Sequence, residues 1–447
     1  MRMWTREKST RRCRQFLSIH KNGEPRLPAW TIPFAYALGA VCLGQILPWL
    51  EEAYSIGRIS GVSPSAAIAI YSATATGMIT LTGIVFSLAF VMVQFSATAY
   101  SPRLVLWMSR DPLVSHAIGI FTATFLYAIG ALAWVDRNGS GKVPFLNVWI
   151  MVALLLGSVG VFVGLIQSLS KLQINSVLAF TGDFARKNID RMYPPLKPSC
   201  SSDFARELAS LPVTQTVLYA GSPRAIQSLN TAALVDMAKR VDGTIEMLSS
   251  VGDTLAESTP LLRVYGSLKQ LTQAEVMSAI RTGTQRTFEQ DPKYSVQLLR
   301  DIAIRALSAG INDPTTAVQA LDQIEDLLLR LGRRCLEIGE VRDESGCLRL
   351  IVAVPSWEDF LDLAFAEIRF FGANSVQVMR RLTALMSDLL ESLPEPRRPA
   401  LRRQQRRLET TIAQSFPNLE DRLEASAEDR EGLGQTRRRS SCTELTK

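Results

Sequence analysis

The sequence predicts an α-helical membrane bundle of four transmembrane helices, followed by a cytoplasmic α+β region with a small β-barrel and a helical core. Three observations lead to this fold class. Four long apolar stretches fall within residues 30–170. Short runs of β-forming residues follow between Pro212 and Gly266, and apolar residues recur at helical spacing from there to about residue 415.

Each apolar stretch is long enough to cross a membrane, because about 20 mostly apolar residues span the ~30 Å of hydrocarbon in a bilayer. None of the stretches contains Asp, Glu, Lys or Arg. Ionisable residues inside the bilayer usually mark proton relays and coupled transport, so their absence argues against a pump or a secondary transporter. The stretches are Trp30–Leu50, Ala66–Phe95, Leu113–Val135 and Val143–Leu169.

Lys and Arg in the short flanks predict the orientation of the bundle. The leader before the first stretch is the most basic flank, whereas the gap after that stretch holds only Arg58 and begins with Glu51-Glu52. The next two gaps carry two basic residues each and do not decide the orientation. Basic residues return after the fourth stretch, at Lys171, Arg186, Lys187 and Arg191. Both termini are therefore predicted to be cytoplasmic, in a multi-pass protein of the bacterial inner (plasma) membrane.

Composition argues against several classes of function. The net charge of +7 is expected of a protein beside anionic headgroups, so it is a weak indication of nucleic-acid binding. The six cysteines lack C-x-x-C spacing and only two histidines are present, His20 and His116, which argues against a metal site. The sequence has no phosphate-cradling glycine loop and no nucleophile elbow. We therefore expect no enzyme, no cofactor and no metal.

The second apolar stretch carries small and hydroxyl residues at spacings of three, four and seven, which places them on one helix face. One interpretation is close helix packing, for which such residues are common in membranes. The other is a face that lines a wet pathway or the axis of a symmetric oligomer. The residues of this face are Ser72, Thr76, Thr80, Gly83, Ser87 and Gln94.

Changes in composition predict the order of the parts along the chain. Tyr193-Pro194-Pro195 begins a stretch that is typical of a linker, and from about Pro417 the chain is polar. The predicted parts are a basic cytoplasmic leader (1–29), the four-helix transmembrane domain (30–170), a linker and helical connection (171–211), the β-barrel module (212–266), a cytoplasmic helical domain (267–415) and a disordered tail (416–447).

The β-barrel is predicted from four runs of β-forming residues and from one turn. Gly252-Asp253, followed by Pro260-Leu261, is similar to a tight turn of biotinyl- and lipoyl-type barrels, but the lysine hairpin that carries their cofactor is missing. A helix capped by Asn230 is expected among the strands. The runs are Thr216–Tyr219, Ala225–Leu229, Thr244–Leu248 and Leu261–Tyr265.

Two helix starts stand out in the helical domain. Asp291-Pro292 is typical of an N-cap followed by a first-turn proline, and the helix is predicted to run to about Ala309. Asp313-Pro314 opens the next helix in the same way. On the first of these helices Asp301 precedes Arg305 by four residues, the favourable order for an ion pair.

At these residues the chain resembles a known bacterial family, domain of unknown function 2254, whose members are described only as predicted integral membrane proteins. The resemblance covers most of the chain from Trp30 to about Leu408, and the sequence departs from the family pattern at Ala309, where proline is usual. Three stretches carry it: Gly77–Leu104 (GMITLTGIVFSLAFVMVQFSATAYSPRL), Arg286–Ala320 (RTFEQDPKYSVQLLRDIAIRALSAGINDPTTAVQA) and Phe360–Gly372 (FLDLAFAEIRFFG).

The resemblance implies membrane residence and a shared cytoplasmic core, but no activity. Its polar positions have two interpretations: a buried ion-pair network or small anion site at a helix N-terminus, or helix caps and pairing between subunits. The matching positions are Arg286, Gln290, Asp291, Asp301, Arg305, Asn312 and Asp313.

Two hypotheses of function remain. In the first, the protein is an oligomeric channel or pore, with the second span at its axis and the soluble part as a cytoplasmic vestibule. In the second, it is a membrane-anchored sensor or scaffold whose barrel and helices dock a cytoplasmic protein. The expected partners are thus the lipid bilayer, further copies of the chain and a cytoplasmic protein, while nucleic acid is not expected.

Overall fold

A computed structural model describes residues 30–53, 62–99, 112–136, 143–170, 174–196 and 204–434 of the chain. These residues form two units, one within Gly23–Val177 and the other within Leu178–Lys447. The predicted basic leader and the end of the predicted tail, from residue 435, lie outside the described residues. The expected succession of four apolar helices and a mixed region of helices and sheets is confirmed.

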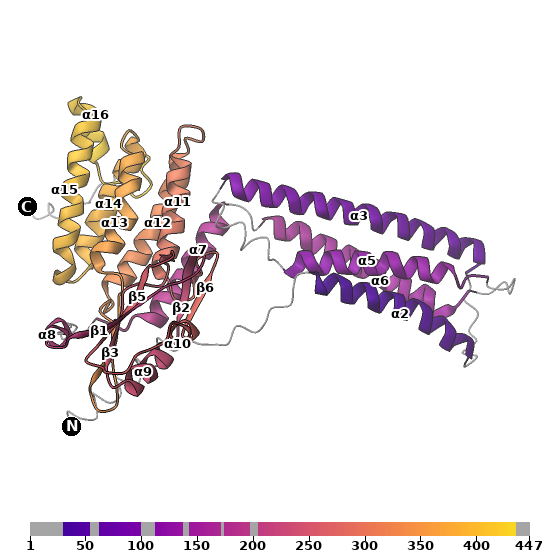
Figure 1. Ribbon diagram of the computed structural model, residues 1–447. Coiled ribbons are helices and arrows are strands. Elements are labelled where there is room, and N and C mark those ends of the chain that lie inside the picture. The colour runs from indigo at the N-terminus through magenta and orange to yellow at the C-terminus, as the bar shows by residue number, and fades with distance from the viewer. Residues whose placement is uncertain are drawn as a thin grey trace, which may run out of the picture. The chain divides into compact units, whose positions relative to one another are not determined.

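The first unit is a bundle of four helices, each long and apolar enough to cross a membrane. Helix α5 lies against each of the other three (Figure 1). Helix α3 has 36 residues and is therefore about 54 Å long, well above the ~30 Å of a hydrocarbon core. The helices are α2 (Thr31–Ala53), α3 (Pro64–Ala99), α5 (Pro112–Leu132) and α6 (Phe145–Ser170).

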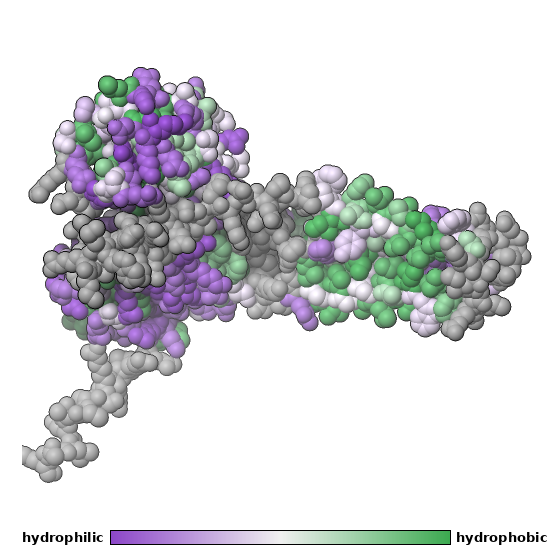
Figure 2. Space-filling model, turned by 90° about the horizontal axis from the view of Figure 1, so that it is seen from below, coloured by the Kyte–Doolittle hydropathy of each residue, from purple (hydrophilic) through white to green (hydrophobic). Residues whose placement is uncertain are grey.

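The outside of this bundle is apolar, as Figure 2 shows for one face. Large side chains such as Phe34, Phe90 and Leu156 are more than half exposed. In water such a surface would be unfavourable, whereas lipid tails accept it. The inside is also closely filled, with Phe121 and Met151 fully buried.

The second unit begins with helix α7 (Ile174–Met192), which lies mostly within it, and contains two β-sheets with three short helices. The predicted runs all became strands. The strands are β1 (Val213–Leu218), β2 (Arg224–Leu229), β3 (Thr244–Met247), β4 (Thr254–Leu255), β5 (Pro260–Tyr265), β6 (Ile280–Gly283), β7 (Glu340–Arg342) and β8 (Leu348–Val352). The short helices are α8 (Phe204–Ala209), α9 (Thr231–Arg240) and α10 (Gln273–Ser278).

The predicted small β-barrel is wrong. One sheet has the order β1-β5-β3-β8-β7 and the other the order β4-β2-β6, so each described sheet is open, and its two edge strands pair with one neighbour only. A barrel requires the first and last strands to pair. Strand β3 pairs instead in parallel with β8, with Ile245 opposite Leu350, and β8 lies far outside residues 212–266. The Gly252-Asp253 turn is present, but it connects β3 of the five-stranded sheet to β4 of the three-stranded sheet.

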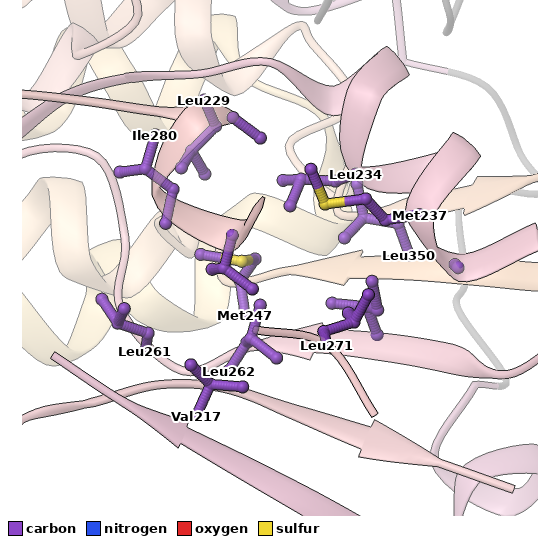
Figure 3. Close-up of a cluster of buried hydrophobic side chains, with 14 of the residues drawn as sticks. Val217, Leu229, Leu234, Met237, Met247, Leu261, Leu262, Leu271, Ile280 and Leu350 are labelled. Carbon is purple, nitrogen blue, oxygen red and sulfur yellow. The ribbon is translucent and has the colours of Figure 1, made fainter. Parts of the chain in front are cut away.

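A shared apolar core holds the sheets and helix α9 together (Figure 3). Strand residues Ile245 and Leu262 and helix residue Leu234 are fully buried in it. As predicted, the Asn230 side chain accepts a hydrogen bond from the Ala233 amide and caps α9. This core also includes Leu350 of β8, so the sheet region and the later part of the chain form one packed body.

Antiparallel helices complete the second unit (Figure 1). They are α11 (Pro292–Ala306), α12 (Pro314–Gly332), α13 (Trp357–Phe371), α14 (Val376–Ser392), α15 (Arg398–Ser415) and α16 (Leu419–Ser426), with a short 3-10 turn, η2 (Glu395–Arg397), before α15. Helix α16 packs against α14 and α15, so the expectation of disorder from residue 416 is wrong for this segment. Asn418 caps this helix. The helix was not predicted because the segment is mostly polar.

The turn between β7 and β8 is built around one carboxylate. Asp343 is buried and accepts hydrogen bonds from the Ser345 amide (3.0 Å), the Cys347 amide (3.0 Å) and Arg349 Nε (2.7 Å). Burial acts to raise the pKa of Asp343, but the hydrogen bonds outweigh it and hold that pKa well below its usual range.

We expect Asp343→Asn to lower the free energy of unfolding by about 1–2 kcal/mol at neutral pH, the scale of a lost charge-assisted hydrogen bond. The unfolded carboxyl takes up a proton near pH 4 while the folded one stays ionised, so this stabilisation is lost as the pH falls below about 4. Thermal unfolding of both proteins between pH 3 and 7 measures this. Asp242→Asn is the control, because Asp242 also contacts Arg349 (3.1 Å) but is 86% exposed. Equal effects of the two changes would contradict the prediction.

Candidate functional site

Three residues at the start of α11 form a polar cluster, two of them predicted from the sequence. Arg286 Nε and Nη2 both donate to Asp291 Oδ2, at 2.8 and 2.5 Å, and Arg286 Nη1 donates to Gln297 Oε1 at 2.7 Å. Asp291 is also the N-cap of α11, where it accepts from the Tyr294 amide at 3.1 Å. The predicted cap, Asp291, is therefore also the ion-pair partner of Arg286.

This carboxylate is deeply buried. Asp291 is 3% exposed, and its burial raises its pKa above the usual value although Arg286 acts in the opposite direction. The Arg286 guanidinium also lies over the Tyr294 ring, 5.2 Å from the ring centroid to Cζ. The charge of Asp291 is thus accommodated only because Arg286 is held against it.

The cluster is closed on one side by a glycine. Gly252 has a φ of +96°, and a Cβ at this position would lie 2.5 Å from Asp291 Oδ2 and 2.6 Å from Arg286 Nη2. Only glycine provides both the backbone conformation and the space. The turn that the sequence assigned to a barrel is therefore a wall of the polar cluster.

The segment before α11 connects the cluster to the sheet and to α7. The Gln290 side chain accepts from the Leu229 amide of β2 at 3.0 Å and donates to its carbonyl at 3.4 Å. On the other side, Asn188 of α7 donates to the Phe288 carbonyl. The role of Gln290 is consequently to fix strand β2 rather than to contact a ligand.

Three further predicted residues lie at the opposite end of α11. Arg305 is in its last turn, Asn312 is exposed in the following turn with a φ of +49°, and Asp313 caps α12 through the Thr316 amide (3.1 Å). Because α11 has 15 residues, its two ends are about 22 Å apart. The seven predicted positions therefore do not form one network.

Asp301 of α11 was predicted to pair with Arg305, but its hydrogen bond is with Arg300. Arg300 Nη2 donates to Asp301 Oδ1 at 2.7 Å, and Arg300 Nη1 lies 3.7 Å from Glu367 Oε1 of α13. This pairing connects two of the three stretches that carry the family resemblance. The contact stabilises the packing of α11 against α13.

The predicted polar face of α3 is on the outside of the bundle. The face residues with a described environment are exposed, whereas Tyr71, Met78 and Val85 on the opposite side are buried against the other helices. Thr76 and Thr80 each donate their hydroxyl to the carbonyl four residues earlier, at 3.0 and 2.9 Å. Close packing by this face inside one described bundle is thus not observed. The exposed residues are Ser72, Thr76, Thr80, Gly83, Ser87 and Gln94.

A second polar group, inside the bundle, was not predicted from the sequence. The Phe145 and Leu146 amides at the start of α6 donate to the Glu51 carboxylate at 2.6 and 3.1 Å, and Tyr127 donates to Asn147 Oδ1 at 2.8 Å. Glu51 was predicted to lie in the gap after the first span, but α2 continues to Ala53. The available signal was an acidic residue at the level where another helix begins, since carboxylates stabilise helix N-termini.

The comparisons with known proteins decide the family. A family model described as "Predicted membrane protein (DUF2254)" matches residues 26–388. The chain belongs to the DUF2254 family. The resemblance seen in the sequence is thereby confirmed, and the chain is a membrane protein with four apolar helices.

Two relatives of this DUF2254 protein are uncharacterised mycobacterial proteins. It is 26% identical over 382 residues to an uncharacterised protein of Mycobacterium bovis and, to the same extent, to one of Mycobacterium tuberculosis. In each case the match covers 83% of this chain and 73% of the relative. No solved structure matches the chain.

Proposed function

We propose that this DUF2254 protein is an oligomeric, channel-like protein of the bacterial inner membrane. In this proposal copies of the chain meet through the polar face of α3. The observation that carries it is the outward position of Thr76, Thr80 and Gly83 on a helix whose other side is packed. Hydroxyl and small residues allow close approach and hydrogen bonding between membrane helices. The proposal assigns no reaction to the chain.

The interior of the bundle supports a pathway between copies rather than through one chain. Phe121 and Met78 are buried between the helices, together with Val85 and Leu165. This apolar layer separates the polar groups around Asn147 from the other end of the bundle. Ions avoid such a dry layer, because leaving water without replacement ligands costs many kcal/mol.

The orientation in this proposal rests on charge. The basic leader and the basic residues after the fourth span, Arg186 and Lys187 among them, favour the cytoplasmic side for both termini. The second unit would then form a cytoplasmic vestibule or a regulatory domain.

A bulky residue at Gly83 tests the proposal. A Cβ at Gly83 meets no atom within 4 Å, so Gly83→Leu is compatible with the folded chain and acts only on what lies outside it. We expect it to change ion flux into liposomes by several-fold and to shift the oligomeric state in detergent. Val159→Leu on α6 is the control, since Val159 is half exposed on the outside of the bundle and belongs to an apolar face without small residues at helical spacing. A native protein that passes no ions under voltage, tension or osmotic shock would exclude the channel.

A second candidate is a membrane-anchored scaffold for a cytoplasmic protein. The observation in its favour is a group of apolar side chains exposed at helix ends of the second unit: Phe370 is 72% exposed, Phe371 50% and Ile311 47%. In a domain surrounded by water such side chains often mark a binding surface. Crosslinking of residues 211–408 in cells distinguishes the two, because recovery of self-association alone contradicts a scaffold.

A further inference from the structure

The second unit contains a cavity that the proposed function does not use. It has a volume of about 350 Å³ and lies where the last turns of α7 meet the end of α12. Three of its six lining residues are arginines from one helix end. The lining residues are Asp190, Asp326, Leu329, Arg330, Arg333 and Arg334.

Two aspartates hold two of these guanidinium groups in place. The Asp190 carboxylate receives Arg334 on one oxygen and Arg330 on the other, the latter at 3.3 Å. Asp326 contacts Arg330 as well, at 3.4 Å. Arg334 also donates to the Tyr193 carbonyl at 2.9 Å. These contacts restrict the side chains before any ligand arrives, which lowers the entropy lost on binding.

The third guanidinium is the one that remains available. Arg333 is exposed, and among the described residues its side chain has no hydrogen-bond or ion-pair partner. Three arginines against two aspartates leave the lining with an excess of one positive charge. The partial negative charge of the α12 C-terminus opposes this excess, but Arg397 donates to the Arg334 carbonyl at 2.9 Å and adds another cation nearby.

We propose that this cavity binds a phosphate-bearing anion. The planar guanidinium fork matches the oxygens of a phosphate group, and charge-assisted hydrogen bonds of this kind are about twice as strong as neutral ones. Arg333 makes the first contact, and Arg330 and Arg334 turn part of their donors from Asp190 to the ligand. The volume is near the lower end for small-ligand sites, which suits one headgroup or one small molecule. The phosphate belongs to a free solute or to a lipid headgroup, since the recognition chemistry is the same.

Binding of inorganic pyrophosphate to the full-length protein in zwitterionic nanodiscs tests the free-solute form. Calorimetric titration is expected to show binding that weakens about tenfold in Arg333→Ala. Arg403→Ala is the control for general electrostatic attraction, because Arg403 is exposed on α15 and is not among the residues that line the cavity. Affinity is expected to be unchanged in this control.

Nanodiscs that contain an anionic phospholipid test the lipid form. If the headgroup is the ligand, these lipids raise the unfolding temperature of the native protein but not that of Arg333→Ala, and pyrophosphate lowers the difference. The proposal is overturned if Arg333→Ala behaves like the native protein in both experiments, or if Arg403→Ala weakens binding as much. Neither readout involves ion flux, so the outcome is independent of the proposed channel.

Discussion

Replacing Arg286 with Leu is expected to lower the free energy of unfolding of the second unit by about 3–5 kcal/mol. The change leaves Asp291 buried, 3% exposed, without the cation that contacts it through two nitrogens. A buried carboxylate that has lost its partner is far more costly than the pair is favourable. Hydrogen exchange along α11, measured as a function of denaturant concentration, should be faster than in the native protein.

The pH dependence provides an independent check of this prediction. Burial already raises the pKa of Asp291, and the loss of Arg286 raises it further. A carboxyl with a raised folded pKa stabilises the fold below its unfolded pKa and loses that contribution as the pH rises through the folded value. Arg286→Leu should therefore recover part of its stability in acid. Arg402→Leu is the control, since Arg402 lies 3.9 Å from Glu395 and both are more than half exposed, so its cost should stay below about 1 kcal/mol. An equal loss in both variants would contradict the prediction.

Gly252→Ala is expected to cost at least about 2 kcal/mol, from backbone strain at a positive φ together with a steric clash. Its new methyl group would lie 2.5 Å from Asp291 Oδ2, so the carboxylate or Arg286 must move. Thermal unfolding of the full chain measures the loss. Gly346→Ala is an informative control, because Gly346 also has a positive φ, +86°, but a Cβ there meets no atom within 4 Å. It should show the strain without the clash.

The two changes should not be additive. Once Arg286→Leu has removed the guanidinium, Gly252→Ala loses one of its two steric conflicts, so the double variant should be less destabilised than the sum of the single variants. Simple additivity would show that the glycine acts on the backbone alone.

Features that depend on neighbouring residues were predictable from the sequence. Asp291, Asp313 and Asn230 each cap the helix that follows, because a short polar side chain beside the first turn is sufficient for this role. The four spans were predictable for a similar reason, since length and apolarity are properties of a single segment.

Features that depend on distant segments were not predictable. The parallel pairing of Ile245 with Leu350 joins residues about a hundred positions apart, and the sequence of neither strand indicates which strand it pairs with. Because only the strands within residues 212–266 were considered together, they were predicted to pair with one another, as in a barrel. The polar positions at Asp291 and Asp313 were grouped because both match the family pattern, although the length of α11 separates them.

Whether a helix face points into or out of the bundle was also not predictable from the sequence. The small and hydroxyl residues of α3 lie on one exposed face, but a pattern on one helix does not tell whether its partner is another segment of the chain or another molecule. The interior polar group was missed for the same reason, because Glu51 has its effect at Phe145 and Leu146, far along the chain.

The pairing of β3 with β8 has a consequence for the order of events during synthesis. When Met247 leaves the ribosome, one edge of its strand has no partner until Val352 follows, roughly ten seconds later at ordinary elongation rates of about 5–20 residues per second. During that interval the sheet presents free amide and carbonyl groups, the kind of edge on which chains aggregate. A chain that is interrupted between these strands retains the unpaired edge of β3 permanently. Such a chain would be a substrate for chaperones and proteases in the cell.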